Sequence, residues 1–581
     1  MLSRNLFGQG ARLVASLAGA LALAACATAP VADQAATTTS APTVRGAVSA
    51  ADPRAEEAGY AMLRRGGSAT DAAIAVMLAL TVVEPQSSGI GGGGFMVRGA
   101  PDGAVTTYDG RETAPAGATP EWFLDAQGKV PPFRESVQSG LSVGVPGNIA
   151  LAAKAHAQHG RLPWADLFAP AIALARDGFR INPRLNNSLT DRSDTGARSE
   201  AARALFYDAS GKPLPVGTTV TNPDLAATLE TLASAGPEAF YRGDLAGEIA
   251  QTVAADTPRD EPMSERDIAT YAAKEREALC APYRAYRVCA MGPPTSGGIA
   301  IVQILGQLER FDLAALGPRN PVAWHLFLES QRLAYADREL YVADSDFVPV
   351  PVEGLIAPDY LAQRSALISA GTTLAEVQPG SPAGANMALA DGDEPKERGT
   401  SHIAVVDASG TMVSYTSTIE SAFGSGLMVG GFYLNNELTD FSRSPTVDGK
   451  PVANRVEGGK RPRSSMSPVV VYDPQGRPFM AVGAAGGSTI PVQTARSIIG
   501  VIDFGLDAED ALGLPFVMAF GDAVMLEEGT WLAESEEAFR KLGHETLSIR
   551  AAPVKAGIVL RQNGEWVSAR DPRLIGQLTL P

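Results

Sequence analysis

Apolar residues along this chain follow two patterns, one with helical spacing and one of short extended runs. Helical spacing predicts helices at residues 54–65, 69–83, 149–159, 170–176 and 321–341. Ser68 directly precedes the second helix and is suited to cap it. Apolar runs bounded by turn residues predict strands at residues 403–406, 469–472 and 479–482. Because helices flank the strands on both sides in the sequence, we expect an α/β protein built as a layered sandwich.

One predicted β-hairpin carries the candidate chemistry. Its first strand ends in the turn sequence Asp-Ala-Ser-Gly at residues 407–410. If a three-residue loop joins the strands, Asp407 pairs with Thr411 and Thr400 lies opposite Thr418. Cleavage before Thr400 would free an α-amine that can act as the base for the Thr400 hydroxyl, so the hairpin is a candidate self-cleavage site. The alternative is an ordinary hairpin, since threonine favours strands.

Several long motifs accompany this hairpin in a fixed order. They are GGSATDAA at 66–73, EPQSSGIGGGGF at 84–95, DGRETAP at 109–115, PPTSGG at 293–298, GTSH at 399–402, STIE at 417–420, FGSG at 423–426, LNNELTDFS at 434–442 and KRPRSSMSP at 460–468. This succession closely resembles the γ-glutamyltransferase (γ-glutamyltranspeptidase) family, from about Gly46 to the C-terminus. The resemblance implies the four-layer αββα fold of N-terminal nucleophile hydrolases. It also implies a large subunit of residues 46–399 and a small catalytic subunit of residues 400–581, which together form one αββα unit.

The resemblance assigns catalytic roles within these motifs. Thr400 would attack the Gly399 carbonyl during self-cleavage and later a γ-glutamyl amide such as glutathione. Water or an amino acid would then accept the glutamyl group. Thr418 would orient the nucleophile, as the pairing argument also indicates. Gly486 and Gly487, which follow the strand at 479–482, would supply oxyanion-hole N–H groups. No cofactor is implied.

A glutamyl donor carries an α-carboxylate and an α-ammonium, so its pocket needs both polarities. Arg111 can hold a carboxylate through two parallel hydrogen bonds. By resemblance, the other members of the pocket are Ser464 and Ser465, which add hydrogen bonds, and Glu420, Glu437 and Asp440, which face the ammonium.

This chain departs from the family pattern at several of these positions. The position of Glu420 is commonly Asn, and that of Glu437 is Gln in some members and Glu in others. Because three carboxylates around one ammonium are too many charges, we expect one to be protonated or paired elsewhere. Residues 443–459, where many members carry a lid, contain no aromatic residue, which predicts a more open acceptor side.

Composition and the N-terminus bear on partners and location. The formal net charge of −16 over 581 residues argues against nucleic acid as a partner. Arg4 and Arg12 precede an apolar stretch at residues 13–25 that is too short to span a membrane comfortably. The sequence LAAC at 23–26 resembles a bacterial lipobox. It predicts a signal peptide of residues 1–25, lipidation of Cys26, a flexible tether at 26–45 and a lipid-anchored periplasmic protein; a plain cleaved signal is the alternative.

The cysteines leave two alternatives open, and the histidines argue against a metal site. Cys280 and Cys289 flank a possible hairpin and are either disulfide-bonded or buried as thiols. The five histidines show no recognisable ligand spacing, so no metal site is expected.

Three functions are compatible with the sequence. The first is a γ-glutamyltransferase or glutathione hydrolase. The second is a related acylase that uses the same Thr400 on glutaryl-type side chains of β-lactams or on poly-γ-glutamate. Its glutaryl version needs no ammonium pocket, so Glu437 and Asp440 argue against it. The third is an unprocessed lipoprotein that binds glutamyl peptides without catalysis, which intact Thr400 and Thr418 disfavour.

Overall fold

The computed structural model describes residues 45–386, 388–390, 392, 399–553 and 555–580. Every described residue belongs to the second of the two units of the chain, Val44–Pro581. The predicted signal peptide, Cys26 and all of the predicted tether except Arg45 lie outside the described residues. None of the described helices combines the length and the apolar character that crossing a membrane requires.

Two six-stranded antiparallel sheets form the centre of the second unit. The first has the strand order β1 (Ala47–Ala50), β9 (Ser401–Val406), β10 (Met412–Thr418), β2 (Gly93–Gly99), β3 (Val105–Gly110), β6 (Lys274–Arg276). The second has the order β21 (Glu565–Arg570), β20 (Lys555–Gln562), β16 (Pro478–Ala485), β15 (Val469–Tyr472), β8 (Tyr286–Met291), β7 (Ala278–Tyr283). Their inner faces share one apolar core, and Ser414 joins them by donating to Val482 O (3.0 Å) and accepting from Val469 N (3.0 Å).

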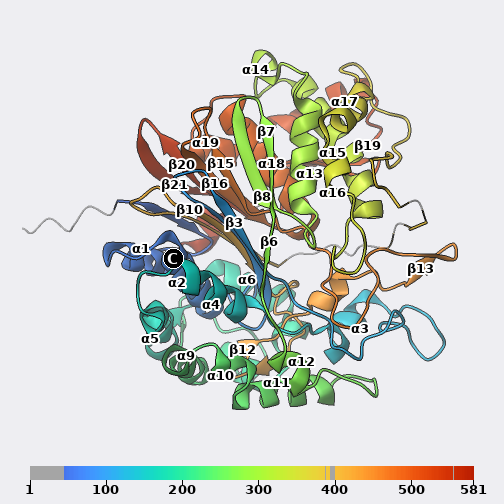
Figure 1. Cartoon of the computed structure of the whole chain (residues 1–581). Coiled ribbons are helices and arrows are strands. Elements are labelled where there is room, and N and C mark those ends of the chain that lie inside the picture. The colour runs from blue at the N-terminus through green and yellow to red at the C-terminus, as the bar shows by residue number, and fades with distance from the viewer. Residues whose placement is uncertain (1–44, 387, 391, 393–398, 554, 581) are drawn as a thin grey trace, which may run out of the picture. The chain divides into compact units, whose positions relative to one another are not determined.

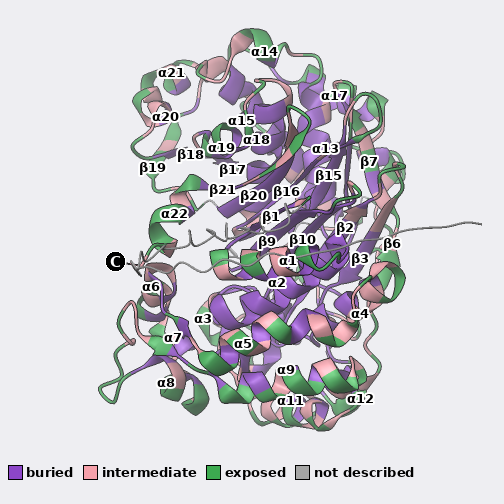
Figure 2. Cartoon of the chain, turned by 90° about the vertical axis from the view of Figure 1, so that its left-hand side faces the viewer, coloured by how far each residue is buried: buried purple, intermediate pink, exposed green. Residues whose placement is uncertain are grey.

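Helices cover the outer face of each sheet and complete four layers, α, β, β and α (Figure 1). The first sheet is covered by α1 (Pro53–Arg64), α2 (Ala69–Val83) and α4 (Asn148–His159), with α5 (Ala169–Asp177) and α9 (Pro223–Ala235) further out. The second is covered by α13 (Gly297–Leu308), α18 (Ile490–Ile502) and α19 (Ala508–Gly513), with α15 (Pro321–Tyr341) packed on α13. Every residue of α2 is buried (Figure 2), as expected for a helix that is apolar on all sides and lies between a sheet and other helices.

The remaining elements extend the two helical layers and the loops. The helices are α3 (Phe133–Val137), α6 (Pro183–Asp191), α7 (Ser193–Gly196), α8 (Glu200–Phe206), α10 (Glu238–Tyr241), α11 (Asp244–Ala255), α12 (Glu265–Ala269), α14 (Leu313–Leu316), α16 (Val352–Leu355), α17 (Pro358–Ala366), α20 (Trp531–Glu534), α21 (Glu536–Lys541) and α22 (Pro572–Leu578). The short strands are β4 (Phe179–Arg180), β5 (Thr219–Val220), β11 (Met428–Val429), β12 (Phe432–Tyr433), β13 (Thr446–Val447), β14 (Lys450–Pro451), β17 (Val517–Phe520), β18 (Ala523–Glu527) and β19 (Thr546–Arg550).

The structure confirms the layered α/β fold and the elements that the apolar pattern predicted. All five predicted helices form, with ends that differ from the prediction by no more than a residue or so, and Ser68 caps α2 through a reciprocal capping box. The hairpin has the predicted register, with Ser401 opposite Ser417 and Val406 opposite Met412. The pattern analysis missed most of the helices between residues 183 and 269.

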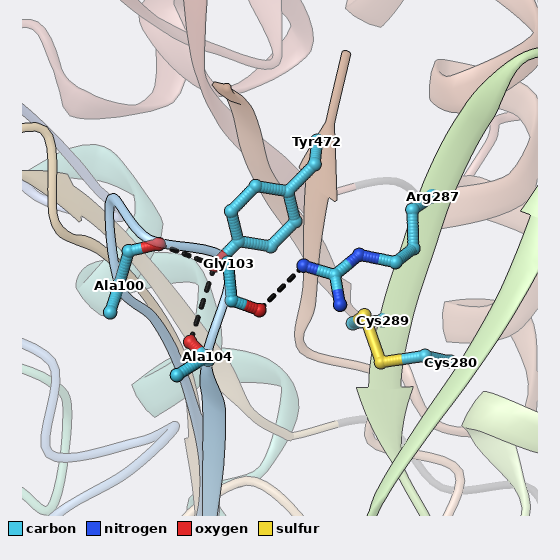
Figure 3. The surroundings of a disulfide bond; sticks show 7 residues. All are labelled: Ala100, Gly103, Ala104, Cys280, Arg287, Cys289 and Tyr472. Atoms are coloured by element: carbon cyan, nitrogen blue, oxygen red, sulfur yellow. Dashed lines mark hydrogen bonds between the residues drawn. A yellow bond between two sulfur atoms is a disulfide. The ribbon is translucent and has the colours of Figure 1, made fainter. Parts of the chain in front are cut away.

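The two cysteines, which the sequence left open, form a disulfide (Figure 3). Cys280 and Cys289 lie directly opposite each other on β7 and β8, and their Cα atoms are 4.1 Å apart. The Arg287 guanidinium, on β8, lies 4.4 Å from the centroid of the Tyr472 ring on the neighbouring strand β15. Arg287 also donates to Gly103 O. The bond from Arg287 thus ties β8 of the second sheet to the β2–β3 turn of the first.

Candidate active site

Thr400 lies immediately before β9, and its hydroxyl faces that of Thr418 at the end of β10. Thr400 Oγ1 donates to Thr418 Oγ1 at 3.2 Å, and both side chains are buried. Thr418 Oγ1 also accepts from the backbone N–H of Glu420 at 2.8 Å. Because Thr418 Oγ1 accepts both bonds, its lone pairs are directed toward the Thr400 hydroxyl and the Glu420 N–H. The antiparallel register of the hairpin therefore brings together the two hydroxyls that the sequence predicted to meet.

The backbone at the predicted cleavage point is strained. Thr400 has a φ of +119°, a region that side chains with a Cβ rarely adopt. A Cβ built on Gly399 would overlap Glu420 O, so only glycine fits there without a shift of the backbone. Thr400 N donates to Ser87 O at 3.0 Å, which holds this segment against the loop after α2. Strain is thus concentrated at the bond before Thr400.

A buried lysine that the sequence analysis missed contacts the nucleophile residue. Lys555 Nζ donates to Thr400 O at 2.7 Å and to Glu84 Oε2 at 2.8 Å. Glu84 also accepts from Ser401 Oγ at 2.9 Å and pairs with Arg184 at 3.2 Å. A single lysine at the start of an apolar strand, Lys-Ala-Gly-Ile-Val-Leu, was the available signal, since such a position is rarely buried without a partner.

Burial and charge together set the protonation of this group. Burial alone would raise the pKa of the Glu84 carboxyl, but Arg184 and Lys555 lower it to about 2. Burial, with a smaller contribution from Arg184, lowers the pKa of the Lys555 ammonium to about 7, although Glu84 acts in the opposite direction. Glu84 therefore stays ionised at neutral pH, while Lys555 is close to its titration point.

The predicted oxyanion-hole glycines form the turn that joins β16 to α18. Gly486 and Gly487 have φ values of +129° and +59°, which L side chains rarely adopt. Thr489 Oγ1 donates to Gly486 O at 2.7 Å, and the Gln493 amide donates to Thr489 Oγ1 at 2.8 Å, so side chains brace the turn. Gly486 lines the same cleft as Thr400, next to the N-terminus of α18, where backbone N–H groups favour negative charge.

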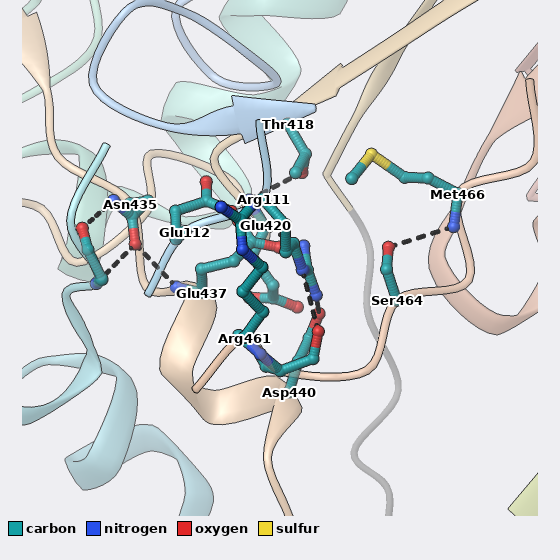
Figure 4. A network of polar contacts seen from close by, with 12 residues as sticks. Arg111, Glu112, Thr418, Glu420, Asn435, Glu437, Asp440, Arg461, Ser464 and Met466 are labelled. Carbon is teal, nitrogen blue, oxygen red and sulfur yellow. Dashed lines mark hydrogen bonds and ion pairs between the residues drawn. The ribbon is translucent and has the colours of Figure 1, made fainter. Parts of the chain in front are cut away.

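Arg111 lies at the centre of the predicted donor pocket (Figure 4). It is 1% exposed, and its guanidinium pairs with Glu437 and with Asp440, the latter at 2.5 Å. Glu112, which the sequence analysis did not assign, lies 3.8 Å from Arg111 Nη1. Glu420 also points into this cluster and accepts from the Asn436 amide. The structure thus gathers the predicted cation and the three predicted carboxylates, and it adds a fourth.

Four buried carboxylates around one guanidinium cannot all be ionised at low cost. Burial, despite Arg111, raises the pKa of Glu112 to about 7, and burial and the nearby Asp440 raise that of Glu420 to about 8. Burial also raises the pKa of Glu437 well above its ordinary value, although Arg111 opposes the shift. The pocket therefore holds protons at neutral pH, as the surplus of carboxylates in the sequence indicated.

The two predicted serines differ in their contacts. Ser464 lies near the cluster in Figure 4, and its Oγ accepts from Met466 N at 3.1 Å. Ser465 Oγ accepts from Arg338 at 2.7 Å, so its position depends on α15. Asn454, from the segment at the lid position, donates to Asp440 O at 2.7 Å and ties that segment to the pocket.

The residues that the structure describes include one group with metal-ligand chemistry, formed by His325, Glu329 and His544. The two imidazoles hydrogen-bond to each other at 2.8 Å, and His325 Nε2 bonds Ser369 O at 2.8 Å. Both Glu329 oxygens accept hydrogen bonds, for example from Leu374 N at 2.7 Å. We assign the group to packing, since these polar atoms already have protein partners.

A four-layer αββα fold with a strained threonine at the start of an inner strand defines the class of N-terminal nucleophile hydrolases. The family profile described as gamma-glutamyltranspeptidase matches residues 55–580. The chain is 39% identical over 481 residues to a Bacillus subtilis protein named glutathione hydrolase proenzyme, covering 81% of this chain and 80% of that protein. It is 36% identical over 547 residues to the Escherichia coli protein of the same name, covering 92% and 91%. The chain therefore belongs to the γ-glutamyltranspeptidase family.

A solved structure shows the same fold. The cephalosporin acylase from Bacillus halodurans matches with a TM-score of 0.79 at 27% identity, covering 91% of this chain and 94% of that one.

Proposed function

We propose that this chain is a self-processing γ-glutamyltransferase and hydrolase that cleaves γ-glutamyl amides such as glutathione. The observation that carries the proposal is the hydroxyl pair of Thr400 and Thr418 at a strained glycyl-threonine bond. The adjacent Arg111 cluster offers the two polarities that a glutamyl group requires.

Self-cleavage uses the Thr400 hydroxyl on its own chain. Oγ1 attacks the carbonyl carbon of Gly399, the C–N bond to Thr400 breaks, and an ester forms with a free α-amine. Water then hydrolyses the ester, which leaves a carboxylate on Gly399 and an N-terminal Thr400. Glycine at 399 permits the required approach, and release of the strained φ at Thr400 favours the reaction.

Turnover repeats the attack on a bound donor. The α-amine of Thr400 takes the hydroxyl proton as Oγ1 attacks the γ-carbonyl carbon. The backbone N–H groups of Gly486 and Gly487 would stabilise the oxyanion, which is supported by the place of Gly486 in the cleft at Thr400, and the leaving amine departs with a proton. Water or an amino acid then resolves the γ-glutamyl ester. Arg111 takes the donor α-carboxylate, while Glu420, Glu437 and Asp440 take the ammonium.

A combined experiment tests the proposal. Purified wild-type protein should give two bands on a denaturing gel, with the smaller beginning at Thr400, and should release the chromophore from a γ-glutamyl anilide. Thr400→Ala should give one inactive chain, because it removes both the cleaving hydroxyl and the nucleophile. Two normal subunits from Thr400→Ala would exclude the mechanism. A single chain from the wild type would instead favour a binding lipoprotein.

A second candidate function is that of an acylase, which would hydrolyse a different acyl group, such as a glutaryl side chain, from its amide. The match to a cephalosporin acylase favours this candidate. Glutaryl-type substrates lack the α-ammonium, so they would bring no cation to the carboxylates that surround Arg111. Comparing a γ-glutamyl anilide with a glutaryl anilide distinguishes the two functions. Faster turnover of the glutaryl compound would favour the acylase.

We also propose export and lipid anchoring at Cys26. The supporting observations are the lipobox-like LAAC sequence and the Ala-, Thr- and Pro-rich stretch that follows it. The enzyme would then work in the periplasm at a membrane surface.

A further inference from the structure

A cleft of about 740 Å³ opens directly at the nucleophile. Its lining includes Thr400 and Gly486, but none of the Arg111 cluster. The walls come from α6, α22 and residues 551–553, which follow β19, and α6 and α22 lie side by side (Figure 2). Since the glutamyl end of a donor would occupy the Arg111 pocket, this cleft lies where the leaving group and the acceptor must lie.

The side chains that line the cleft carry more positive than negative charge, which would not favour an amine as the bound group. Among the described residues that line it, three are cations, Arg184, Lys555 and Arg550, and one is a carboxylate, Asp191. Arg184 and Lys555 both pair with the buried Glu84 and are held close to Thr400.

Arg550 differs from the other two cations. It is exposed, and its guanidinium lies 5.6 Å from the centroid of the Phe520 ring, which also lines the cleft. Its backbone belongs to the sheet ladder, because Arg550 is the last residue of β19 and lies opposite Glu527 of β18 in the strand register. Arg550 is therefore a positioned cation that is available to a ligand.

The position of Arg550 along the chain suits a short peptide. Arg550 stands five residues before Lys555, so the Cα atoms of the two residues are at most about 18 Å apart. The Lys555 ammonium donates to Thr400 O. Phe520, Ala552 and Leu574 give the same cleft an apolar surface that can contact a side chain.

We propose that this cleft binds the part of the substrate beyond the γ-glutamyl group, and that Arg550 pairs with a free carboxylate on it. The inference rests on the proposed function and narrows its substrates. Preferred donors are γ-glutamyl peptides that end in a free carboxylate. Preferred acceptors are amino acids or short peptides with the same group. A guanidinium binds a carboxylate through two parallel hydrogen bonds. A leaving group or acceptor that is a simple amine has no carboxylate for Arg550 to bind.

The test compares γ-glutamylcysteinylglycine with the same tripeptide bearing a C-terminal carboxamide. For the wild type, kcat/KM should be at least about tenfold higher with the free carboxylate, a difference of about 1.4 kcal/mol. Arg550→Ala should bring the two donors to within about twofold of each other, mainly by lowering kcat/KM for the carboxylate form. The γ-glutamyl anilide, which lacks the carboxylate, should lose much less kcat/KM in the variant than the free tripeptide does.

Arg319→Ala is the matched control, because Arg319 is exposed between α14 and α15 and does not line the cleft. It should keep the wild-type preference. If Arg550→Ala gives no two-band pattern on a gel, Arg550→Gln replaces it, and the wild-type comparison of the two donors still decides. No preference in the wild type, or equal losses with both donors in the variant, would overturn the proposal. Failure of the wild type to hydrolyse the anilide would instead refute the proposed function.

Discussion

Glu420→Gln tests whether the crowded donor pocket holds a proton. Glutamine has the size of glutamate, and its amide oxygen can still accept the hydrogen bond from Asn436, but it cannot ionise. In the wild type, burial and then the charge of Asp440 raise the pKa of Glu420 from 4.5 to about 8. The substitution therefore removes one titration and leaves the packing in place.

The effect on stability follows from the sign of the shift. Between pH 4.5 and about 8, the folded chain keeps a proton on Glu420 that the unfolded chain releases, so the free energy of unfolding falls as pH rises. The slope for one group is about 1.4 kcal/mol per pH unit, so this group should cost the wild type on the order of 3 kcal/mol between about pH 5.5 and about pH 7.5. In Glu420→Gln this part of the fall in the free energy of unfolding should be absent.

Thermal unfolding of the uncut Thr400→Ala chain, with and without Glu420→Gln, measures this difference. Glu57→Gln is the control, because Glu57 is exposed on α1 and pairs with Arg64 at the surface. In the processed enzyme, the KM for a γ-glutamyl anilide should fall as pH rises toward 8, since ionised Glu420 attracts the donor ammonium. This slope should be shallower in Glu420→Gln. Parallel pH profiles for the two proteins in both assays would refute the assignment.

Three further predictions concern other parts of the molecule. Arg111→Lys should lower kcat/KM at least about tenfold for donors with an α-carboxylate, but little for a donor that lacks it, because lysine cannot form two parallel hydrogen bonds. Lys555→Met should slow self-cleavage and destabilise the chain by about 3–5 kcal/mol, since it leaves Glu84 buried with one partner fewer. A gel time course measures the cleavage rate and thermal unfolding measures the stability. Unchanged values in both would contradict a role for Lys555 at Thr400. Cys26→Ser should release the enzyme from membranes, and unchanged fractionation would favour a plain cleaved signal.

The sequence was sufficient for the features that depend on local patterns. The register of the β9–β10 hairpin follows from the loop length, which fixes the pairing of Thr400 with Thr418 before any tertiary contact is known. The helix at Ala69–Val83 was equally visible, because a continuous apolar segment follows a strong capping residue. The family motifs indicated the layered fold, and they are the basis of the residues predicted for the donor pocket.

The remaining features depend on contacts between distant segments. Lys555 meets Glu84 across 471 positions of the chain, and neither residue carries a local signal for the other. The disulfide needed a Cα separation that only the paired strands β7 and β8 supply. Glu112 was overlooked because it follows Arg111 in the sequence, and only folding brings it toward the other carboxylates.

In the proposed mechanism, Glu420 connects processing, orientation of the nucleophile and donor binding. Its carbonyl oxygen occupies the space that requires glycine at 399, and its N–H donates to the Thr418 hydroxyl that accepts from Thr400. Its side chain belongs to the acidic cluster around Arg111. Its own φ of +73° is a left-handed conformation that costs about 1–3 kcal/mol for a non-glycine residue. Since the backbone contacts do not depend on the carboxylate, substitutions that alter only the side-chain charge can change donor binding without removing the constraint that drives cleavage at Thr400.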